Sequence, residues 1–271
     1  MLTLDIGLLA VPINRALLLL SFGVALLVGW LSGRRRGGNP EPALFAMLFG
    51  GLIAARLGFV LQYAGHYADS WWGWLDIRDG GFSPSFGVLG VLLVGLWQYW
   101  RRVALRRPLL LASASGLLLW LALLGTFNQL QRSQQLPDFT LQDLQGAPVS
   151  LRGDFSQPLV INLWASWCPP CRREMPVLAE AQQRYPQVDI LLVNQGEQAE
   201  EVRRYLQREG LALDNLLLDP GNRLGEFAGS RMLPTTLFFS ADGRLVNVHL
   251  GELSSATLAR DIAHLETQGS L

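Results

Sequence analysis

Hydrophobic residues are distributed very differently in the two halves of this 271-residue chain. Up to about residue 130, Leu, Gly, Val, Ala and Trp form long, nearly uninterrupted apolar runs, whereas later apolar runs are short and alternate with charged, helix-like patterns. A helix that crosses a bilayer needs about 20 mostly apolar residues. The pattern therefore predicts a membrane domain over residues 1–133 and a separate water-exposed domain over residues 134–271.

Four apolar runs in the first half have roughly the length of a membrane-spanning helix. They cover residues 8–31, 43–63, 82–100 and 109–127. No basic residue precedes the first run and three more runs follow it, so we interpret it as a retained helix rather than a cleaved signal peptide. The expected fold of this half is an α-helical bundle of four transmembrane helices.

The charges of the short loops predict the orientation of this bundle, because Arg and Lys collect on the cytoplasmic side of a membrane. Arginines are concentrated in the first and third loops, and the second loop is acidic. The residues concerned are Arg34, Arg35, Arg36, Arg101, Arg102, Arg106 and Arg107, against Asp69, Asp76, Asp79 and the single Arg78 of the second loop. We therefore expect a multi-pass protein of a bacterial inner membrane, with its N-terminus and its second domain on the periplasmic side.

In the second half, apolar strand patterns alternate with amphipathic helix patterns. A hairpin is predicted over residues 139–151, and continuous apolar runs at residues 158–165 and 188–194 predict buried strands. Helices are expected at about residues 169–185 and before Gly210, which is a normal helix stop. A short strand and a short helix follow, then a hairpin turn at residues 241–243 and a closing helix over residues 254–266. This order predicts an α/β domain with a mixed central sheet and helices on both faces.

Cys168 and Cys171 are the only cysteines in the chain, and they stand where a predicted buried strand meets a predicted helix. A C-x-x-C pair in this position is typical of a thiol–disulfide exchange site. A helix N-terminus favours a thiolate, so we expect Cys168 to attack and Cys171, one turn later, to resolve the mixed disulfide. Pro169 and Pro170 suit the first helical turn, where their missing N–H groups cost nothing.

Other roles for this cysteine pair fit the sequence less well. A structural disulfide that closes so small a loop gains little entropy. A zinc site needs more ligands than the two cysteines, and the three histidines lack ligand spacing. Haem attachment needs a histidine after the second cysteine, where the chain has Arg172. We therefore expect redox exchange with no metal and no cofactor beyond the disulfide, and zero net charge gives no reason to expect nucleic-acid binding.

Three stretches, "LPDFTLQDLQG", "VINLWASWCPPCRREMP" and "LPTTLFFSADGRLV", together resemble the TlpA/ResA/DsbE group of thioredoxin-fold proteins, which are membrane-tethered periplasmic thiol–disulfide oxidoreductases. The resemblance covers nearly the whole second domain. It implies a thioredoxin-like fold and a disulfide reductase of protein substrates that a DsbD/CcdA-type partner keeps reduced. Apocytochrome c, a metallochaperone and a mis-oxidised periplasmic protein all fit as substrates, and thiol oxidation is the alternative, because redox poise and partner set the direction.

The same resemblance implies roles for residues around the dithiol. Trp167 is the aromatic residue before the pair, and Pro234 resembles the cis-proline that faces it and exposes the backbone of Leu233 to an extended substrate. Thioredoxin itself has a buried aspartate at the position matching Asn162, so a proton acceptor for Cys171 must come from elsewhere. Glu174 is the candidate, and an ordinary solvated helix residue is the alternative interpretation.

The stretches "GGLIAARLGFVLQY" and "IRDGGFSPSFGVLGVLL" of the first half resemble the N-terminal part of prolipoprotein diacylglyceryl transferase. Arg56 lies within a predicted span, where a charged residue is expensive and often functional. The alternative interpretation is that Arg56 pairs within the bundle. The chain has Ser85, Phe86 and Gly87 where that family has His-Gly-Gly, and the later helices are missing. We interpret the bundle as a degenerate relative that serves as anchor, docking surface or lipid contact, and a lipid-modifying transferase with an accessory redox domain is the alternative function.

Overall fold

The computed structural model describes residues 3–6, 9–34, 38–67, 71–132, 134–151, 157–230 and 232–269. The predicted positions Arg35, Arg36 and Asp69, and the predicted boundary at residue 133, lie outside these ranges. The chain divides into two compact units, one of Val11–Ile77 and Gly81–Asn128 and the other of Met1–Ala10, Arg78–Gly80 and Gln129–Leu271. Each unit is a separate body with its own core, and the two are described in turn.

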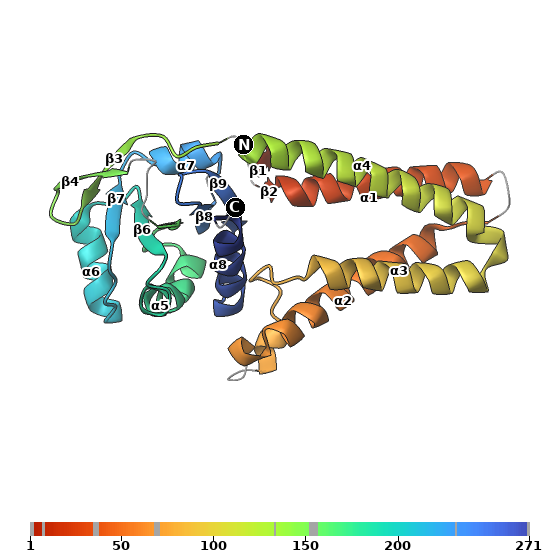
Figure 1. Cartoon of the computed structure of the whole chain (residues 1–271), viewed down its shortest axis with the longest axis horizontal. Helices are drawn as coiled ribbons and strands as arrows, with labels where there is room; N and C mark the ends of the chain where they lie inside the picture. Colours follow the sequence, from red (N-terminus) through yellow and green to blue (C-terminus); the bar gives the residue numbers. More distant parts are fainter. Residues whose placement is uncertain are drawn as a thin grey trace. The chain divides into compact units, whose positions relative to one another are not determined.

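Four long helices make up the first unit (Figure 1). They are α1 (Ile13–Arg34), α2 (Glu41–Gln62), α3 (Pro84–Arg101) and α4 (Arg106–Arg132), joined by the short 3₁₀ helices η1 (Ala64–Tyr67), η2 (Trp71–Trp74) and η3 (Val103–Leu105). The prediction that the first helix begins near residue 8 is wrong, because strand β2 (Leu9–Pro12) pairs there with β1 (Thr3–Ile6). In a helix begun at residue 8, Pro12 would lack the N–H that bonds the carbonyl of residue 8.

Three helices of the described chain are long and apolar enough to cross a membrane, namely Ile13–Arg34, Glu41–Gln62 and Val103–Phe127. Helix α3 is not among them, since its 18 residues end in the polar and aromatic sequence Gln-Tyr-Trp-Arg. The three apolar helices indicate that the first half anchors the chain in a membrane. The predicted count of four spans stays a prediction.

Small residues bring the helices of this unit close together. Helix α1 buries Ser21, Ala25, Gly29 and Gly33, which recur every four residues along one face. A Cβ added at Gly116 of α4 would lie 2.9 Å from the Cβ of Ala25, so α1 and α4 pack nearly backbone to backbone. Such small-residue interfaces are the usual way in which membrane helices associate. Figure 1 shows the resulting pairs, α1 beside α4 and α2 beside α3.

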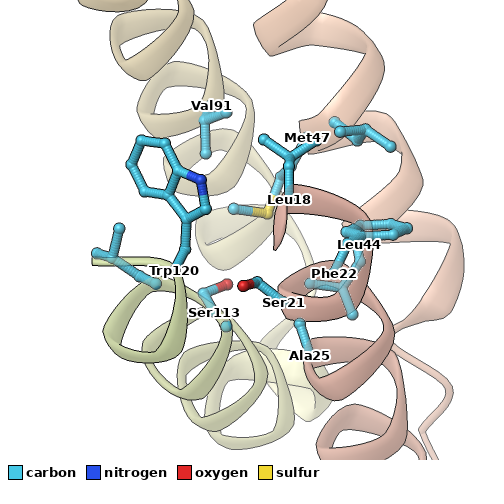
Figure 2. Close-up of a pocket in the computed structure, with 12 residues that line it drawn as sticks. Leu18, Ser21, Phe22, Ala25, Leu44, Met47, Val91, Ser113 and Trp120 are labelled. Carbon is cyan, nitrogen blue, oxygen red and sulfur yellow. The ribbon is translucent and has the colours of Figure 1, made fainter. Parts of the chain in front are cut away.

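An apolar pocket of about 210 Å³ lies between the helices of this bundle (Figure 2). Leu18, Phe22, Met47 and Trp120 are among the side chains that line it. Figure 2 also shows the hydroxyl groups of Ser21 and Ser113 turned toward each other at its wall. None of the residues that line this pocket is ionisable, and glyceryl transfer needs a base, so the pocket gives no support to a transferase.

The second unit is built on a seven-stranded sheet with the order β4-β3-β7-β6-β5-β8-β9. Strands β5, β6 and β7 run parallel and the other pairs are antiparallel, so the predicted mixed sheet is confirmed. The strands are β3 (Phe139–Asp143), β4 (Pro148–Leu151), β5 (Leu159–Trp164), β6 (Asp189–Gln195), β7 (Leu216–Asp219), β8 (Thr235–Phe239) and β9 (Leu245–Leu250).

The helices of this unit are α5 (Pro169–Arg184), α6 (Ala199–Glu209), α7 (Arg223–Ala228) and α8 (Ser255–Gly269), and they cover both faces of the sheet, as predicted. Trp164 of β5 and Phe238 of β8 belong to one buried cluster with residues of α5, α6 and α8. Phe227 of α7 stacks on Phe239, the next residue along β8. Because successive residues of a strand point to opposite faces, α7 covers the other side.

Candidate functional site

The two cysteines lie where β5 passes into α5. Cys168 is the N-cap of α5, and its Sγ accepts a hydrogen bond from the backbone N–H of Cys171 at 3.3 Å. Pro169 and Pro170 occupy the first helical turn. The two cysteines form a disulfide with a Cα–Cα distance of 5.3 Å, and only 3% and 0% of their surfaces are exposed. The structure therefore brings the predicted pair together at the positive end of a helix dipole.

Trp167 and the loop before β8 form the rim of this site. The Leu233–Pro234 peptide bond is cis, as the sequence predicts. Thr235, the first residue after this bond, pairs with Leu163 near the end of β5, so the cis-proline loop lies beside the strand that leads to the dithiol. Trp167 is 68% exposed, and it lines one pocket together with Leu233. An exposed aromatic ring and a partly buried cis-proline loop thus flank two buried cysteines.

Glu174 lies on α5, three residues after Cys171, and its side chain is fully buried. The interpretation of Glu174 as a solvated helix residue is therefore wrong. Its Oε1 accepts a hydrogen bond from Asn162 Nδ2 at 2.8 Å, and its Oε2 accepts one from the backbone N–H of Leu253 at 2.8 Å. Asn162 Nδ2 also donates to Thr236 Oγ1 at 2.9 Å. Asn162 thus holds the carboxyl group on the sheet side of α5.

Burial raises the pKa of Glu174 from its usual 4.5 to about 8, although the hydrogen bonds from Leu253 and Asn162 lower it. With this pKa, about nine-tenths of the carboxyl groups carry a proton at pH 7. Residues three apart on a helix share a face, so this acid lies on the side of α5 that carries Cys171. Because its pKa is close to the reference value of about 8.5 for a thiol, a proton can pass between the two groups at little cost.

Sequence reasoning missed a second buried acid, Glu197. Its Oε2 accepts hydrogen bonds from the backbone N–H of Ser166 and from Asn194 Nδ2, each at 2.7 Å, and its Oε1 accepts one from Ser166 Oγ at 2.5 Å. Ser166 precedes Cys168 by two residues, so Glu197 fixes the loop that carries the attacking thiol. A signal was available, because Glu197 follows β6 and Ser166 follows β5, and the carboxyl ends of neighbouring parallel strands meet at one edge of a sheet.

Arg56 belongs to the helical unit and is not part of the dithiol site. Its guanidinium is buried and donates hydrogen bonds to four backbone carbonyl groups of the loop between α2 and α3, at 2.6–3.1 Å. These carbonyls belong to Gly73, Trp74, Asp76 and Gly81. The side chain also lies over the ring of Tyr67, 5.5 Å from its centroid. Arg56 therefore pairs within its own unit and holds this loop in place.

The mixed sheet, the C-x-x-C pair at a helix start and the cis-proline beside it define a thioredoxin-like redox domain. Residues 131–265 match the Redoxin family. The thiol–disulfide oxidoreductase ResA of Halalkalibacterium halodurans is 34% identical over 123 residues, which are 45% of this chain and 69% of the relative. ResA of Geobacillus thermodenitrificans is 32% identical over 133 residues, 48% of this chain and 74% of the relative.

Among solved structures, the pneumococcal exposed lipoprotein thioredoxin Etrx1 of Streptococcus pneumoniae is 29% identical, with a TM-score of 0.41, over 48% of this chain and all of that chain. The identity and coverage of the two ResA relatives establish the family: the chain belongs to the ResA group of thiol–disulfide oxidoreductases. Its activity is thiol–disulfide exchange through Cys168 and Cys171, acting on protein thiols.

Proposed function

We propose that this chain is a membrane-anchored disulfide reductase whose thioredoxin-like domain works on the outer face of the cytoplasmic membrane. The observation that carries the proposal is the dithiol at the start of α5 with the buried, hydrogen-bonded Glu174 one turn behind it. The Cys168 thiolate attacks one sulfur of a substrate disulfide, and the other substrate sulfur leaves as a thiolate. The sulfur of Cys171 then attacks Cys168 and releases the second substrate thiolate, so two electrons pass to the substrate and the Cys168–Cys171 disulfide forms.

The buried acid and the loop before β8 have separate roles in this reaction. Cys171 must lose a proton before it attacks, and the ionised fraction of Glu174, about one-tenth of the carboxyl groups at pH 7, accepts it while Asn162 holds the carboxyl group in position. The backbone of Leu233, beside Pro234 at the rim of the site, pairs with an extended segment of the substrate. Trp167 covers the rim through which that segment reaches Cys168.

The surroundings of Cys171 support reduction rather than oxidation of substrates. A strong oxidant of this class stabilises its own reduced form. Here Cys171 has no exposed surface, and Glu174 lies on the same face of the helix. Burial disfavours a thiolate at Cys171, so of the two thiols only Cys168, at the helix N-terminus, stabilises the reduced form as a thiolate. A weakly stabilised dithiol gives up its electrons readily.

The helical half supports the location and the need for a partner. Helix α1 ends at Arg34, α3 ends at Arg101 and α4 begins at Arg106, and arginines at these helix ends are the pattern of a cytoplasmic side. The bundle contains no cysteine, so it cannot carry electrons by thiol exchange. A membrane electron-transfer protein of the DsbD/CcdA type would therefore restore the dithiol, and the substrates would be oxidised proteins outside the cytoplasm.

Alkylation trapping in living cells tests the direction of electron flow. Acid quenching followed by a mass-shifting thiol reagent should find the dithiol mostly reduced in growing cells and oxidised once the electron-transfer partner is removed. The double variant with Ser at 168 and 171 marks the position of the unmodified chain. A mostly oxidised dithiol in normal cells would contradict a reductase and favour the oxidase.

The same double variant tests the orientation, because it contains no thiol. Gln145→Cys adds one on the exposed turn between β3 and β4. A reagent that does not cross membranes should label it in intact cells. Labelling only after lysis would place the domain in the cytoplasm.

A further inference from the structure

A pocket of about 460 Å³ opens beside the dithiol, within the size range of ligand sites. Trp167, which directly precedes Cys168, and Leu233 of the cis-proline loop line its near side. Its other walls come from the loops that follow β6 and β7, from α7 and from Ser230. A group bound here would therefore lie beside Trp167, the residue that precedes the attacking Cys168.

Glycines leave the inside of this pocket open. Gly196, Gly221 and Gly225 all line it. A Cβ added at Gly225 would lie 3.4 Å from Gln195 Oε1 and 3.4 Å from the carbonyl oxygen of Ser230. Two hydrogen-bond acceptors thus converge on the space that Gly225 leaves free.

Gln195 is the most informative of the lining residues. It is 5% exposed, and its Nε2 donates to Asp219 Oδ2 at 3.3 Å. That contact fixes the orientation of the amide, so its Oε1 faces Gly225, and this oxygen is buried without a hydrogen-bond partner among the described residues. A buried acceptor without a partner is unfavourable, so a donor that reached this oxygen from the pocket would be stabilised.

The charge on the described lining of the pocket is negative. Glu226, which is exposed, is the one ionisable residue among the described residues that line it. Arg223 lies nearby, but its guanidinium donates to the carbonyl of Thr140 and lies 3.9 Å from Asp219, so its charge is directed away toward β3. The pocket therefore combines a buried amide oxygen that lacks a partner among the described residues with a carboxylate among its lining residues.

We propose that this pocket binds a Lys or Arg side chain of the substrate protein, close to the disulfide that Cys168 attacks. The N–H groups of the cation donate to Gln195 Oε1 and to the carbonyl of Ser230, and Glu226 pairs with its charge. In an extended substrate, residues two apart point to the same side, so a basic residue two positions from the attacked cysteine is placed to enter. This specificity rests on the proposed function, because it requires Cys168 to attack a protein disulfide.

Two synthetic peptides test the proposal with the reduced full-length chain in detergent. Each carries one cysteine as a mixed disulfide with thionitrobenzoate, and they differ only in Lys or norleucine two positions from that cysteine. Release of the coloured thiolate in a single turnover gives the rate constant for attack by Cys168. We expect the wild-type chain to react about 10-fold faster with the Lys peptide, since hydrogen bonds to charged groups are the stronger ones.

Glu226→Gln should lower this preference about 3-fold. Gly225→Ala places a methyl group between Gln195 Oε1 and the carbonyl of Ser230 at ordinary contact distances, so the fold is kept. This variant should nearly abolish the preference for the Lys peptide. Glu200→Gln, which removes an exposed acid on α6 outside the pocket, is the matched control and should keep the full preference. Equal rates for the two peptides, or a full preference in both pocket variants, would overturn the subsite. No reaction with either peptide would instead overturn the exchange activity on which the subsite depends.

Discussion

Replacing Glu174 by Gln should remove a proton-binding group that titrates near pH 8. Raising the pKa of this carboxyl from 4.5 to about 8 corresponds to about 5 kcal/mol, the cost of ionising it in the fold rather than in water. Between these two values the unfolded chain has lost the proton and the native chain still holds it. Stability therefore falls as pH rises from 4.5 to about 8 and levels off above that.

The Gln side chain should fit this site without a new clash. The carboxyl group accepts two hydrogen bonds, from Asn162 and from Leu253, and an amide can accept only one of them through its oxygen. Asn162 Oδ1 has no partner among the described residues, so the Asn162 amide can turn over and accept from the new N–H group, although its own NH2 group then takes the place of the unpaired oxygen. Thr236 can then donate to the same oxygen. The variant should fold, and it should lose the titration rather than the structure.

Two measurements on the oxidised full-length chain check this expectation. Infrared difference spectra across pH 6 to 10 should show the C=O band of a protonated carboxylic acid disappearing with a midpoint near 8 in the wild type and not in Glu174→Gln. Hydrogen exchange of the β5 amides should give an opening free energy that falls by about 2 kcal/mol from pH 6 to 8 in the wild type, and by far less in the variant. A midpoint near 4.5, or the same pH dependence in both chains, would refute the buried-acid account.

Four further substitutions test other parts of the account. Glu197→Gln leaves the donors of Ser166 and Asn194 poorly matched, so hydrogen exchange should show a loss of about 1–3 kcal/mol, while the exposed control Glu180→Gln changes stability by less than about 0.5 kcal/mol. Gly210→Ala should lower the opening free energy from hydrogen exchange by about 1 kcal/mol, because Gly210 ends α6 with a φ of 64°. An unchanged opening free energy would contradict that role. Arg56→Gln takes donors from four loop carbonyls, so limited proteolysis between α2 and α3 should become several-fold faster, and an unchanged rate would contradict the role of Arg56. Burial lowers the pKa of His249, so the unfolded chain takes up a proton before the native chain does as the pH falls. Stability should therefore decrease below pH 6.5, and His249→Gln should remove that decrease.

Much of the α/β unit could be predicted because its sequence carries local signals. Strand β5 is buried at every residue and reads as one apolar run. Gly146 and Gly210 adopt positive φ angles at a predicted turn and a predicted helix end. The dithiol and Pro234 lie within motifs that are informative in combination. In each case a short stretch of sequence was enough to specify the local structure.

The features that sequence reasoning missed depend on contacts between distant segments. The local sequence fits either a buried acid or a solvated Glu174, because the backbone N–H that donates to its carboxyl group belongs to Leu253, 79 residues later. The partners of Arg56 are backbone carbonyls, which leave no trace in the identity of the loop residues. Glu197 could be found only by first placing β5 and β6 side by side in the same direction. The predicted start of the first helix is wrong because the apolar run continues through β2, so that hydrophobicity alone does not reveal where Pro12 ends the strand and the helix begins.

Capture of a mixed disulfide tests the central claim most directly, namely that Cys168 attacks and Cys171 resolves. The full-length chain with Cys171→Ser, reduced and then mixed with a disulfide-bonded protein, should accumulate a covalent adduct that dithiothreitol releases. Cys168→Ser should give little or none under the same conditions, because Cys171 has no exposed surface and lies inside α5, away from the helix N-terminus that favours a thiolate. Adducts of equal yield in both variants, or in neither, would contradict the account.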